Sequence, residues 1–338
     1  MNHYENCMQC PKKCGVNRTQ KQKGFCQETD DLKIAFAGLH FGEEPLVTVF
    51  GGSGTIFITG CTLRCAFCQN YQISQNGYGS NVDSKEFTKM CLDLQNAGAE
   101  NINIVTGSHH IPKLAEFIRA AKDAGVTIPF CWNSSAYETV ESLELLKGLV
   151  TIWLPDLKTL SSSLSKDLFL APDYPQVAAK AIKWMIQNNP LKIKTVESPK
   201  NAKSIEWAQD GEPREKMEQG VIIRHLFLPG KFQETADVLQ WLKENADTKS
   251  CISLMNQYTP VSFDEEKTKL ERRQKALKAI ENRLVSKEED LDIQDLIEAY
   301  DFEYLFYQEL SDDTSWLPDF TKPQPFSNAL ATPIWHCK

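Results

Sequence analysis

One stretch is the most informative about the fold, Gly60-Cys61-Thr62-Leu63-Arg64-Cys65-Ala66-Phe67-Cys68-Gln69-Asn70, and it directly follows an apolar, strand-like run at residues 55–59. Its three thiols, Cys61, Cys65 and Cys68, have the spacing C-x3-C-x2-C, which is too tight for a relaxed set of disulfides. Cysteine thiolates are the usual ligands of iron–sulfur clusters, and a cubane needs four ligands, so three cysteines leave one iron open to a substrate or cofactor. We therefore predict a metal cluster on the loop after this strand.

Length and composition set the broad class of the protein. The chain has 338 residues, with 41% hydrophobic and 24% charged residues, which is typical of a globular protein with a sizeable core. Its net charge of -8 gives no basic field, so we expect no nucleic-acid partner and no membrane partner. The N-terminus lacks a basic n-region and an apolar h-region, and no apolar stretch is long enough to span a bilayer. We expect a cytoplasmic protein.

The cysteine count indicates metal ligation, because a reducing cytosol keeps thiols free. Of the eleven cysteines, four lie near the N-terminus, Cys7, Cys10, Cys14 and Cys26, within a segment rich in charge, Gly and Pro. Four thiolates at this spacing suit either a zinc ion or a second, fully ligated iron–sulfur cluster, and four unrelated thiols are the alternative. The remaining cysteines are isolated, and we expect them to be buried, without a chemical role: Cys91, Cys131, Cys251 and Cys337.

From residue 55 onward, short apolar strand signals alternate with helical periodicity, which indicates repeated parallel β/α units. The predicted strands are residues 55–59, 101–105, 128–132, 151–154, 221–228 and 251–255. The predicted helices are residues 84–94, 111–124, 136–146, 177–186 and 236–245. Six units fall short of the eight that close a barrel, so the fold class is α/β, a partial (β/α)6 TIM-like barrel that is open along one side.

Three regions follow from this pattern. Residues 1–52 form a cysteine-rich N-terminal segment, residues 53–258 the partial barrel, and residues 259–338 a helical C-terminal extension and tail. Residues 189–220 are polar and poorly periodic, which indicates an insertion and not a barrel element. The extension carries two predicted helices and an aromatic, strand-like run at residues 302–310. The tail from residue 321 is expected to lie over the barrel or to be partly disordered.

The sequence on either side of the three thiols resembles that of a known family. Residues 52–61, with Cys68-Gln69-Asn70-Tyr71, resemble the radical SAM superfamily and, within it, relatives of pyruvate formate-lyase activating enzyme, over nearly the full chain. The resemblance implies that Cys61, Cys65 and Cys68 hold a 4Fe-4S cluster whose fourth iron is chelated by S-adenosylmethionine. It also implies that the reduced cluster cleaves this cofactor to methionine and a 5'-deoxyadenosyl radical, which then removes a hydrogen atom from the substrate.

By the same resemblance, Phe67 and Gln69 would shield the cluster and touch the adenine. Thr106 and Ser108 stand where relatives carry a Ser-Gly-Gly-Glu stretch that holds the amino group of the cofactor. The acid is absent, with Ile111 in its place, so Thr106, Ser108 or backbone carbonyls would have to make that contact.

Three further strand ends supply candidates. Asn133 and Ser135 could bind ribose hydroxyls or the carboxylate, or could instead cap a helix. Asp156 and Lys158 match the family's Asp-Leu-Lys and offer opposite charges to the zwitterionic methionyl end, with a surface ion pair as the alternative. Arg224 alternates with its neighbour His225 on one strand, so only one of the two can face the interior, where a charge needs a partner such as the cofactor or the cluster.

The first functional hypothesis is a radical SAM enzyme that takes hydrogen from a glycine of a glycyl radical enzyme, with an electron donor such as flavodoxin or ferredoxin. Because the extra cysteines precede the motif, a radical SAM enzyme that modifies a small molecule or a peptide is the alternative. A different class is a non-catalytic scaffold in which both cysteine groups bind zinc. Colour would separate the classes, since an iron–sulfur protein is brown and a zinc protein is colourless.

Overall fold

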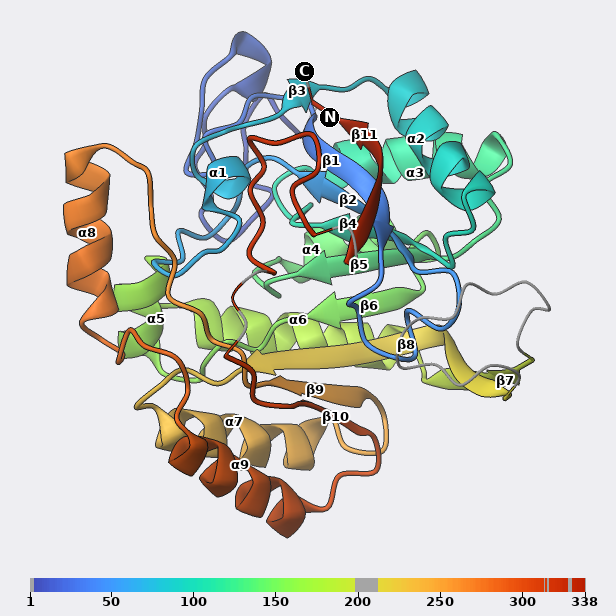
Figure 1. The fold of residues 1–338 in the computed structure, drawn as a ribbon. Helices are drawn as coiled ribbons and strands as arrows, with labels where there is room; N and C mark the ends of the chain where they lie inside the picture. Colours follow the sequence, from blue (N-terminus) through green and yellow to red (C-terminus); the bar gives the residue numbers. More distant parts are fainter. Residues whose placement is uncertain (1–2, 198–211, 313, 315, 328–329, 338) are drawn as a thin grey trace.

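A computed structural model describes residues 3–197, 212–312, 314, 316–327 and 330–337. Its centre is a curved sheet of parallel strands, drawn as arrows in Figure 1. The parallel strands, in sheet order, are β2 (Ser53–Ile58), β4 (Ile102–Val105), β5 (Phe130–Ser134), β6 (Ile152–Pro155), β8 (Arg214–Leu226), β9 (Cys251–Met255) and β10 (Leu305–Gln308). The six predicted strands are all present, and the aromatic run supplies the seventh, so the α/β partial barrel is confirmed.

Helices connect successive parallel strands, as β/α units require. They are α2 (Ser84–Asn96), α3 (Ile111–Asp123), α4 (Val140–Leu143) with the 3-10 turn η2 (Glu144–Leu146), α5 (Ser162–Phe169), α6 (Tyr174–Asn188), α7 (Phe232–Asn245), α8 (Lys267–Leu277) and α9 (Lys287–Tyr300). Side-chain caps begin several of them: Asp83 accepts a hydrogen bond from Glu86 N at α2, and Ser286 and Glu289 form a capping box at α9. Short elements elsewhere are η1 (Arg18–Gln20) and α1 (Tyr71–Ser74).

Antiparallel strands extend the sheet beyond β2. Strand β1 (Lys33–His40) pairs with β2, with the short β3 (Ser80–Asn81), and with β11 (Ala331–His336) near the C-terminus. The predicted tail thus contains an edge strand. In Figure 1 the chain after β10 passes in front of the sheet to reach β11. The rings of Phe320 and Phe326 pack against Phe57 of β2, with centroids 5.3 and 5.4 Å apart, so the tail covers the face of the sheet opposite the helices.

The predicted insertion needs a correction. Residues 189–220 contain β7 (Lys192–Val196), which pairs antiparallel with the first half of β8. Gly220, expected to end the insertion, pairs with Ile152 of β6 within the barrel sheet. Charged side chains alternate with apolar ones here because one face of the ribbon is exposed, and this hides the strand pattern from a search for apolar runs. The middle of the expected insertion, residues 198–211, lies outside the described residues.

Alternation along the strands separates two cores. On β5, Phe130 and Trp132 join the large core beneath the helices, whereas Cys131 packs with Ile152 and Ile222 on the inner face of the sheet. Polar side chains at inner-face positions near the strand ends therefore point into the barrel.

Strand pairing crosses both expected domain boundaries, because β1 pairs with β2 and β10 with β9. None of the helices in the described residues has the length and apolar character needed to cross a membrane.

Candidate cofactor site

The loop after β2 presents the three predicted thiols. Cys61, Cys65 and Cys68 are each half-buried. The N–H of Leu63 points to Cys61 Sγ at 3.4 Å, and Cys68 Sγ lies 3.2 Å from the hydroxyl oxygen of Ser74. Gly60 begins the loop with φ = +89°, and a Cβ there would lie 2.5 Å from Glu28 Cγ, so this turn requires glycine.

The thiols influence one another electrostatically. Burial raises the pKa of Cys61 to about 12, with a further contribution from Cys68, although the Leu63 N–H opposes it. Burial also raises the pKa of Cys65, against the favourable charge of Lys158. A thiolate at such a position needs a strong positive charge beside it, and a bound metal centre is the usual one.

The loop offers the donor type that an iron–sulfur cluster takes, three cysteine thiols. In the described part of the chain, no three Cys, His, Asp or Glu side chains are grouped as one metal ion requires.

A buried arginine holds the backbone of this loop. Arg273 of α8 is only 1% exposed and donates to the carbonyls of Cys65 (3.2 Å) and Ala66 (3.3 Å). Its charge is balanced by Glu265, which accepts two hydrogen bonds at 2.5 and 3.0 Å. Gln75 also donates to the Cys65 carbonyl, at 3.0 Å. The C-terminal extension thereby fixes the position of the loop.

A charged network occupies the ends of the neighbouring strands. Asp156, just after β6, accepts hydrogen bonds from Lys158 Nζ (2.7 Å) and Arg224 Nε (3.0 Å). Arg224 also donates to Asn133 Oδ1 at 2.5 Å, and its Nη1 lies 3.6 Å from Glu43 Oε2. The structure thus brings together four predicted side chains from three strand ends. It adds the carboxylate of Glu43, which was not predicted.

The charges of this network are set by its pairing. Burial opposes ionisation of Asp156, but Lys158 and Arg224 outweigh it and lower the pKa of this carboxyl. Burial likewise disfavours the charged Lys158, and Asp156 and Cys65 outweigh it and raise the pKa of the amine. Burial raises the pKa of Glu43 despite Arg224. Lys158 is the link between the network and the thiol loop, since it interacts with both Asp156 and Cys65.

The N-terminal cysteines lie beside the same loop. Burial raises the pKa of Cys10 to about 12 against a hydrogen bond from the backbone of Lys12, and the charges of Cys26, Cys7 and Cys14 raise it further. Burial lowers the pKa of Lys12, although the charges of Asp173 and of thiols from both groups, Cys10, Cys14 and Cys61, oppose it.

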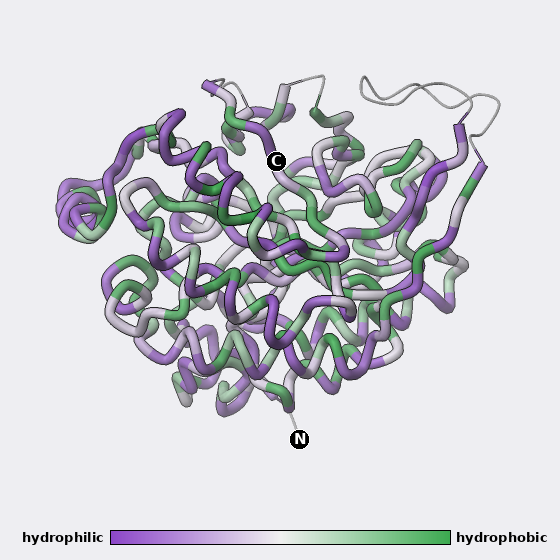
Figure 2. The backbone as a smooth tube through the Cα atoms, turned by 90° about the horizontal axis from the view of Figure 1, so that it is seen from below, coloured by the Kyte–Doolittle hydropathy of each residue, from purple (hydrophilic) through white to green (hydrophobic). Residues whose placement is uncertain are grey.

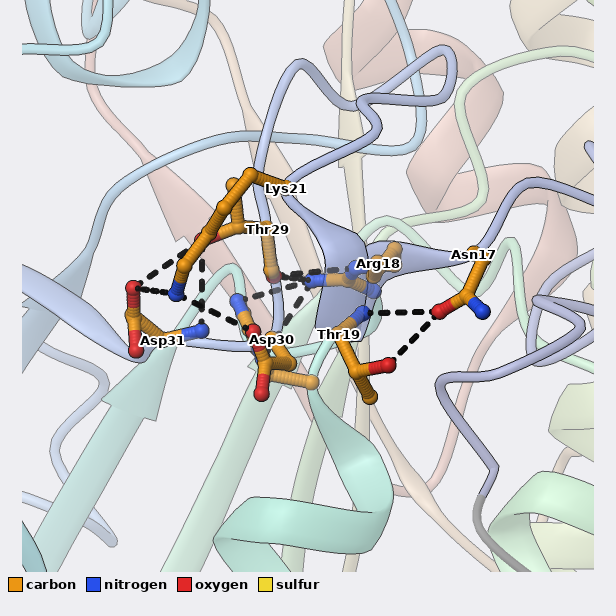
Figure 3. A network of polar contacts seen from close by, with 8 residues as sticks. Asn17, Arg18, Thr19, Lys21, Thr29, Asp30 and Asp31 are labelled. Atoms are coloured by element: carbon orange, nitrogen blue, oxygen red, sulfur yellow. Dashed lines mark hydrogen bonds and ion pairs between the residues drawn. The ribbon is translucent and has the colours of Figure 1, made fainter.

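Arg18 joins this segment to the barrel. It is 1% exposed and donates to the carbonyls of Thr29 (2.5 Å from Nη2) and His109 (2.6 Å from Nη1). Figure 3 shows Arg18 and Thr29 within a larger polar network, in which Lys21 also binds Asp31 at 2.7 Å. The cysteine-rich segment is therefore fastened to the loop that follows β4.

A family model supplies the decisive comparison. Residues 55–193, which include the thiol loop and the ends of β4, β5 and β6, match the model described as the radical SAM superfamily. Residues 55–193 are thus a radical SAM domain. This family implies a 4Fe-4S cluster and S-adenosylmethionine as cofactors, and it supports an enzyme.

Individual proteins similar to this chain have low sequence identity to it. An uncharacterized protein of Methanocaldococcus jannaschii, MJ0674, is 29% identical over 267 residues, which cover 77% of this chain and 68% of that protein. A structure of Streptococcus suis SuiB bound to the precursor peptide SuiA is 13% identical, with a TM-score of 0.48, and covers 74% of this chain. A domain of pyruvate-formate lyase-activating enzyme from Bacteroides vulgatus is 10% identical, with a TM-score of 0.35, and covers 59% of this chain and 92% of that domain.

This chain spans less than half of SuiB, 46% of its length. Likenesses with TM-scores below 0.5 do not identify a substrate.

The other predicted contacts of the radical SAM site are spread out. The ring of Phe67 packs against Phe169 and Tyr258, with centroids 6.0 and 5.8 Å apart. Gln69 lines a cavity of 530 Å³ formed with the segments after β9 and near residue 317. Ser135 is half-buried.

The predicted cofactor contacts after β4, Thr106 and Ser108, have hydrogen-bond partners within the fold. The Ser108 hydroxyl is buried and donates to Glu138 Oε1 at 2.5 Å. Thr106 has φ = +65°, unusual for a β-branched residue, and its N–H donates to the carbonyl of Asn133 at 2.9 Å. Ser108 is thus engaged by a carboxylate in this structure, and the backbone of Thr106 is tied to β5.

The alternation predicted for β8 is confirmed. Arg224 faces the interior, whereas His225 faces α7, donating from Nδ1 to the Leu157 carbonyl (2.7 Å) and accepting at Nε2 from the Thr235 hydroxyl (2.9 Å).

Three site residues were not foreseen: Glu43, Glu138 and Arg273. Glu43 lies in a Gly-Glu-Glu-Pro stretch that indicates only a turn, and Arg273 lies in a highly charged helix that indicates a solvated face. Nothing local distinguishes them, because their partners are distant in sequence.

Proposed function

We propose that this chain is a radical SAM enzyme in which Cys61, Cys65 and Cys68 hold a 4Fe-4S cluster and the network of Asn133, Asp156, Lys158 and Arg224 binds S-adenosylmethionine. The observation that carries the proposal is the pairing of Asp156 with both Lys158 (2.7 Å) and Arg224 (3.0 Å) at the strand ends. A cofactor that chelates the cluster through its amino acid end would meet this network.

The side chains of the network would bind and orient the methionyl end of the cofactor. Lys158 offers a cation to its carboxylate and Asp156 an anion to its ammonium, and Arg224 keeps Asp156 ionised and fixed. Phe67 lies in an aromatic group next to the last thiol and would exclude water there. When bound, the cluster and cofactor supply reductive cleavage to a 5'-deoxyadenosyl radical, which abstracts hydrogen from the substrate.

For the substrate we propose a glycine of a glycyl radical protein, on the basis of the activating-enzyme resemblance in the sequence. A small molecule or a peptide is the alternative, favoured by the cysteine-rich segment that precedes the motif. Thr106, Ser108, Ser135 and Gln69 stay as proposed cofactor contacts, and a flavodoxin or ferredoxin as the proposed electron donor, in the cytoplasm.

For the N-terminal thiols, Cys7, Cys10, Cys14 and Cys26, we propose a second iron–sulfur cluster, with zinc as the alternative. Support comes from their mutual electrostatic influence and from Arg18, which lies 3.9 Å from Cys7 Sγ through Nη1. A buried cation beside several thiolates stabilises an anionic metal–thiolate centre.

The test is anaerobic reconstitution with iron and sulfide, followed by incubation with S-adenosylmethionine and dithionite and chromatography for 5'-deoxyadenosine. We expect product from the wild type and none from Cys65→Ala, because that variant lacks one of three cluster ligands. Cys91→Ala is the matched control, since Cys91 is a buried cysteine of α2 that is not a proposed ligand, and it should retain cleavage.

Undiminished cleavage by Cys65→Ala would contradict the proposal that Cys65 holds the cluster that cleaves the cofactor. A colourless wild-type protein that binds only zinc at both cysteine groups would instead support the non-catalytic scaffold.

A further inference from the structure

A basic groove lies directly beside the thiol loop. It has a volume of 520 Å³, and α5, α8 and the loop line it. Figure 1 shows α5 and α8 together at the left edge of the molecule, and Figure 2 shows a largely hydrophilic helix, seen end-on, at the same edge. Six cationic side chains line the groove: Arg64, Lys166, Arg272, Arg273, Lys275 and Lys278.

The groove concentrates positive charge on an acidic chain. Asp167 is the acid among its lining residues in the described part of the chain, and Arg273 is balanced by Glu265 beneath the surface. The whole chain carries a net charge of -8. A positively charged patch on a negatively charged protein attracts a negatively charged partner to that place.

The cations of the groove also repel one another. Arg64, Arg272 and Arg273 all line the groove, so three guanidinium groups share one surface. Burial lowers the pKa of Arg272, and the charge of Arg273 lowers it further. A bound anionic surface would relieve this repulsion, so the groove favours a negatively charged occupant.

The floor of the groove is part of the cluster loop. Ala66, between Cys65 and Cys68, lines it, and Arg273 on its wall donates to the carbonyls of Cys65 and Ala66. Three apolar side chains also line it and provide the apolar contact that a protein surface needs: Leu170, Ala276 and Ala279. A partner in the groove would therefore contact residues of the cysteine loop itself, Arg64 and Ala66.

We propose that this groove docks an acidic electron-carrier protein, which passes one electron to the cluster held by Cys61, Cys65 and Cys68. The inference rests on the proposed function and specifies its partner surface. The reduced carrier loses one electron and the cluster gains it; no bond forms or breaks in that step. Small reductants such as dithionite need no docking surface, and this difference makes the proposal testable.

The experiment uses the full-length, reconstituted protein and a reduced acidic flavodoxin as the probe. Lys275→Glu/Lys278→Glu reverses two exposed cations of the groove, and Lys85→Glu/Lys287→Glu makes the same charge change on α2 and α9. We expect the groove variant to raise the KM for flavodoxin at low salt by at least about tenfold, with a weaker salt dependence than the wild type. With dithionite as reductant, the groove variant should form 5'-deoxyadenosine at a rate within about twofold of wild type. The control variant should stay within about twofold of wild type with either reductant, flavodoxin or dithionite.

Direct binding of flavodoxin, measured by calorimetry, separates this inference from the proposed function, because it needs no turnover. If the wild type binds flavodoxin and the groove variant does not, docking at the groove is supported, even if incubation with dithionite yields no 5'-deoxyadenosine. Equal flavodoxin affinity or KM in the wild type and the groove variant would overturn the proposal, as would an equal loss in the control. Binding of a polyuridylate RNA at the groove in place of flavodoxin would also overturn it.

Discussion

Lys158 is the residue that joins the two halves of the proposed site. Its amine lies 2.7 Å from Asp156, and Cys65 contributes to raising its pKa. The sequence predicts Asp156 and Lys158 as a pair, but a surface ion pair would look the same at that level. Their partial burial and the second contact of Asp156, with Arg224, distinguish a built site from a surface pair.

We expect Lys158→Gln to weaken binding of S-adenosylmethionine by roughly 10- to 100-fold, because it removes a charge-assisted hydrogen bond to the ligand. Iron content should not change, since Lys158 is not a proposed ligand and Arg224 still pairs with Asp156. Equilibrium binding of the cofactor to the reconstituted protein, with iron quantified in parallel, is the measurement. Lys180→Gln, on the exposed side of α6, serves as the control. Unchanged affinity in Lys158→Gln would remove this residue from the cofactor site.

At the scale of elements, the parallel strands could be predicted and the edge strands could not. A buried parallel strand is a continuous apolar run, and all six such runs are strands. Strand β11 contains Pro333 and exposed positions, and its place beside β1 depends on a partner about 300 residues away in sequence. The same limit applies to the site: Asp156 and Lys158 follow a recognisable strand, whereas Arg273 reaches Cys65 from more than 200 residues away.

The tail has a structural role that can be measured. Phe326 is 9% exposed, and its ring lies 5.9 Å from Phe36 and 5.4 Å from Phe57. We expect Phe326→Ala to lower the free energy of unfolding by about 3 kcal/mol, because it leaves a cavity among these rings. Urea denaturation of the wild type and the variant measures this difference. Phe232→Ala, at a position that is 39% exposed, should change it by less than about 1 kcal/mol. A loss no larger than that control would mean that the tail does not stabilise the barrel.

For the whole molecule, the radical SAM barrel, the cysteine-rich segment and the C-terminal extension converge on one loop. Arg18 fastens the N-terminal segment beside it, and Arg273 holds its backbone from α8. Regions that are distant in sequence therefore determine the geometry of the thiols. Assembly of the cluster is expected to depend on the complete chain, because the loop alone lacks these contacts.

Acid should destabilise the whole fold through its buried histidines. The side chain of His225 is 2% exposed, and both nitrogens of its neutral ring have hydrogen-bond partners. Burial lowers its pKa to about 4. Since an unfolded histidine titrates near pH 6.5, only the unfolded state takes up the proton between about pH 6.5 and 4. The stabilisation is complete above pH 6.5 and is lost as the pH falls through that window, by up to about 1.4 kcal/mol per pH unit for this group. Urea midpoints at pH 7.5 and 5.0 should therefore differ more for the wild type than for His225→Gln, which lacks the titrating ring. Because the comparison is between two proteins that share every other titrating group, an equal pH dependence in both would show that His225 is protonated within the fold.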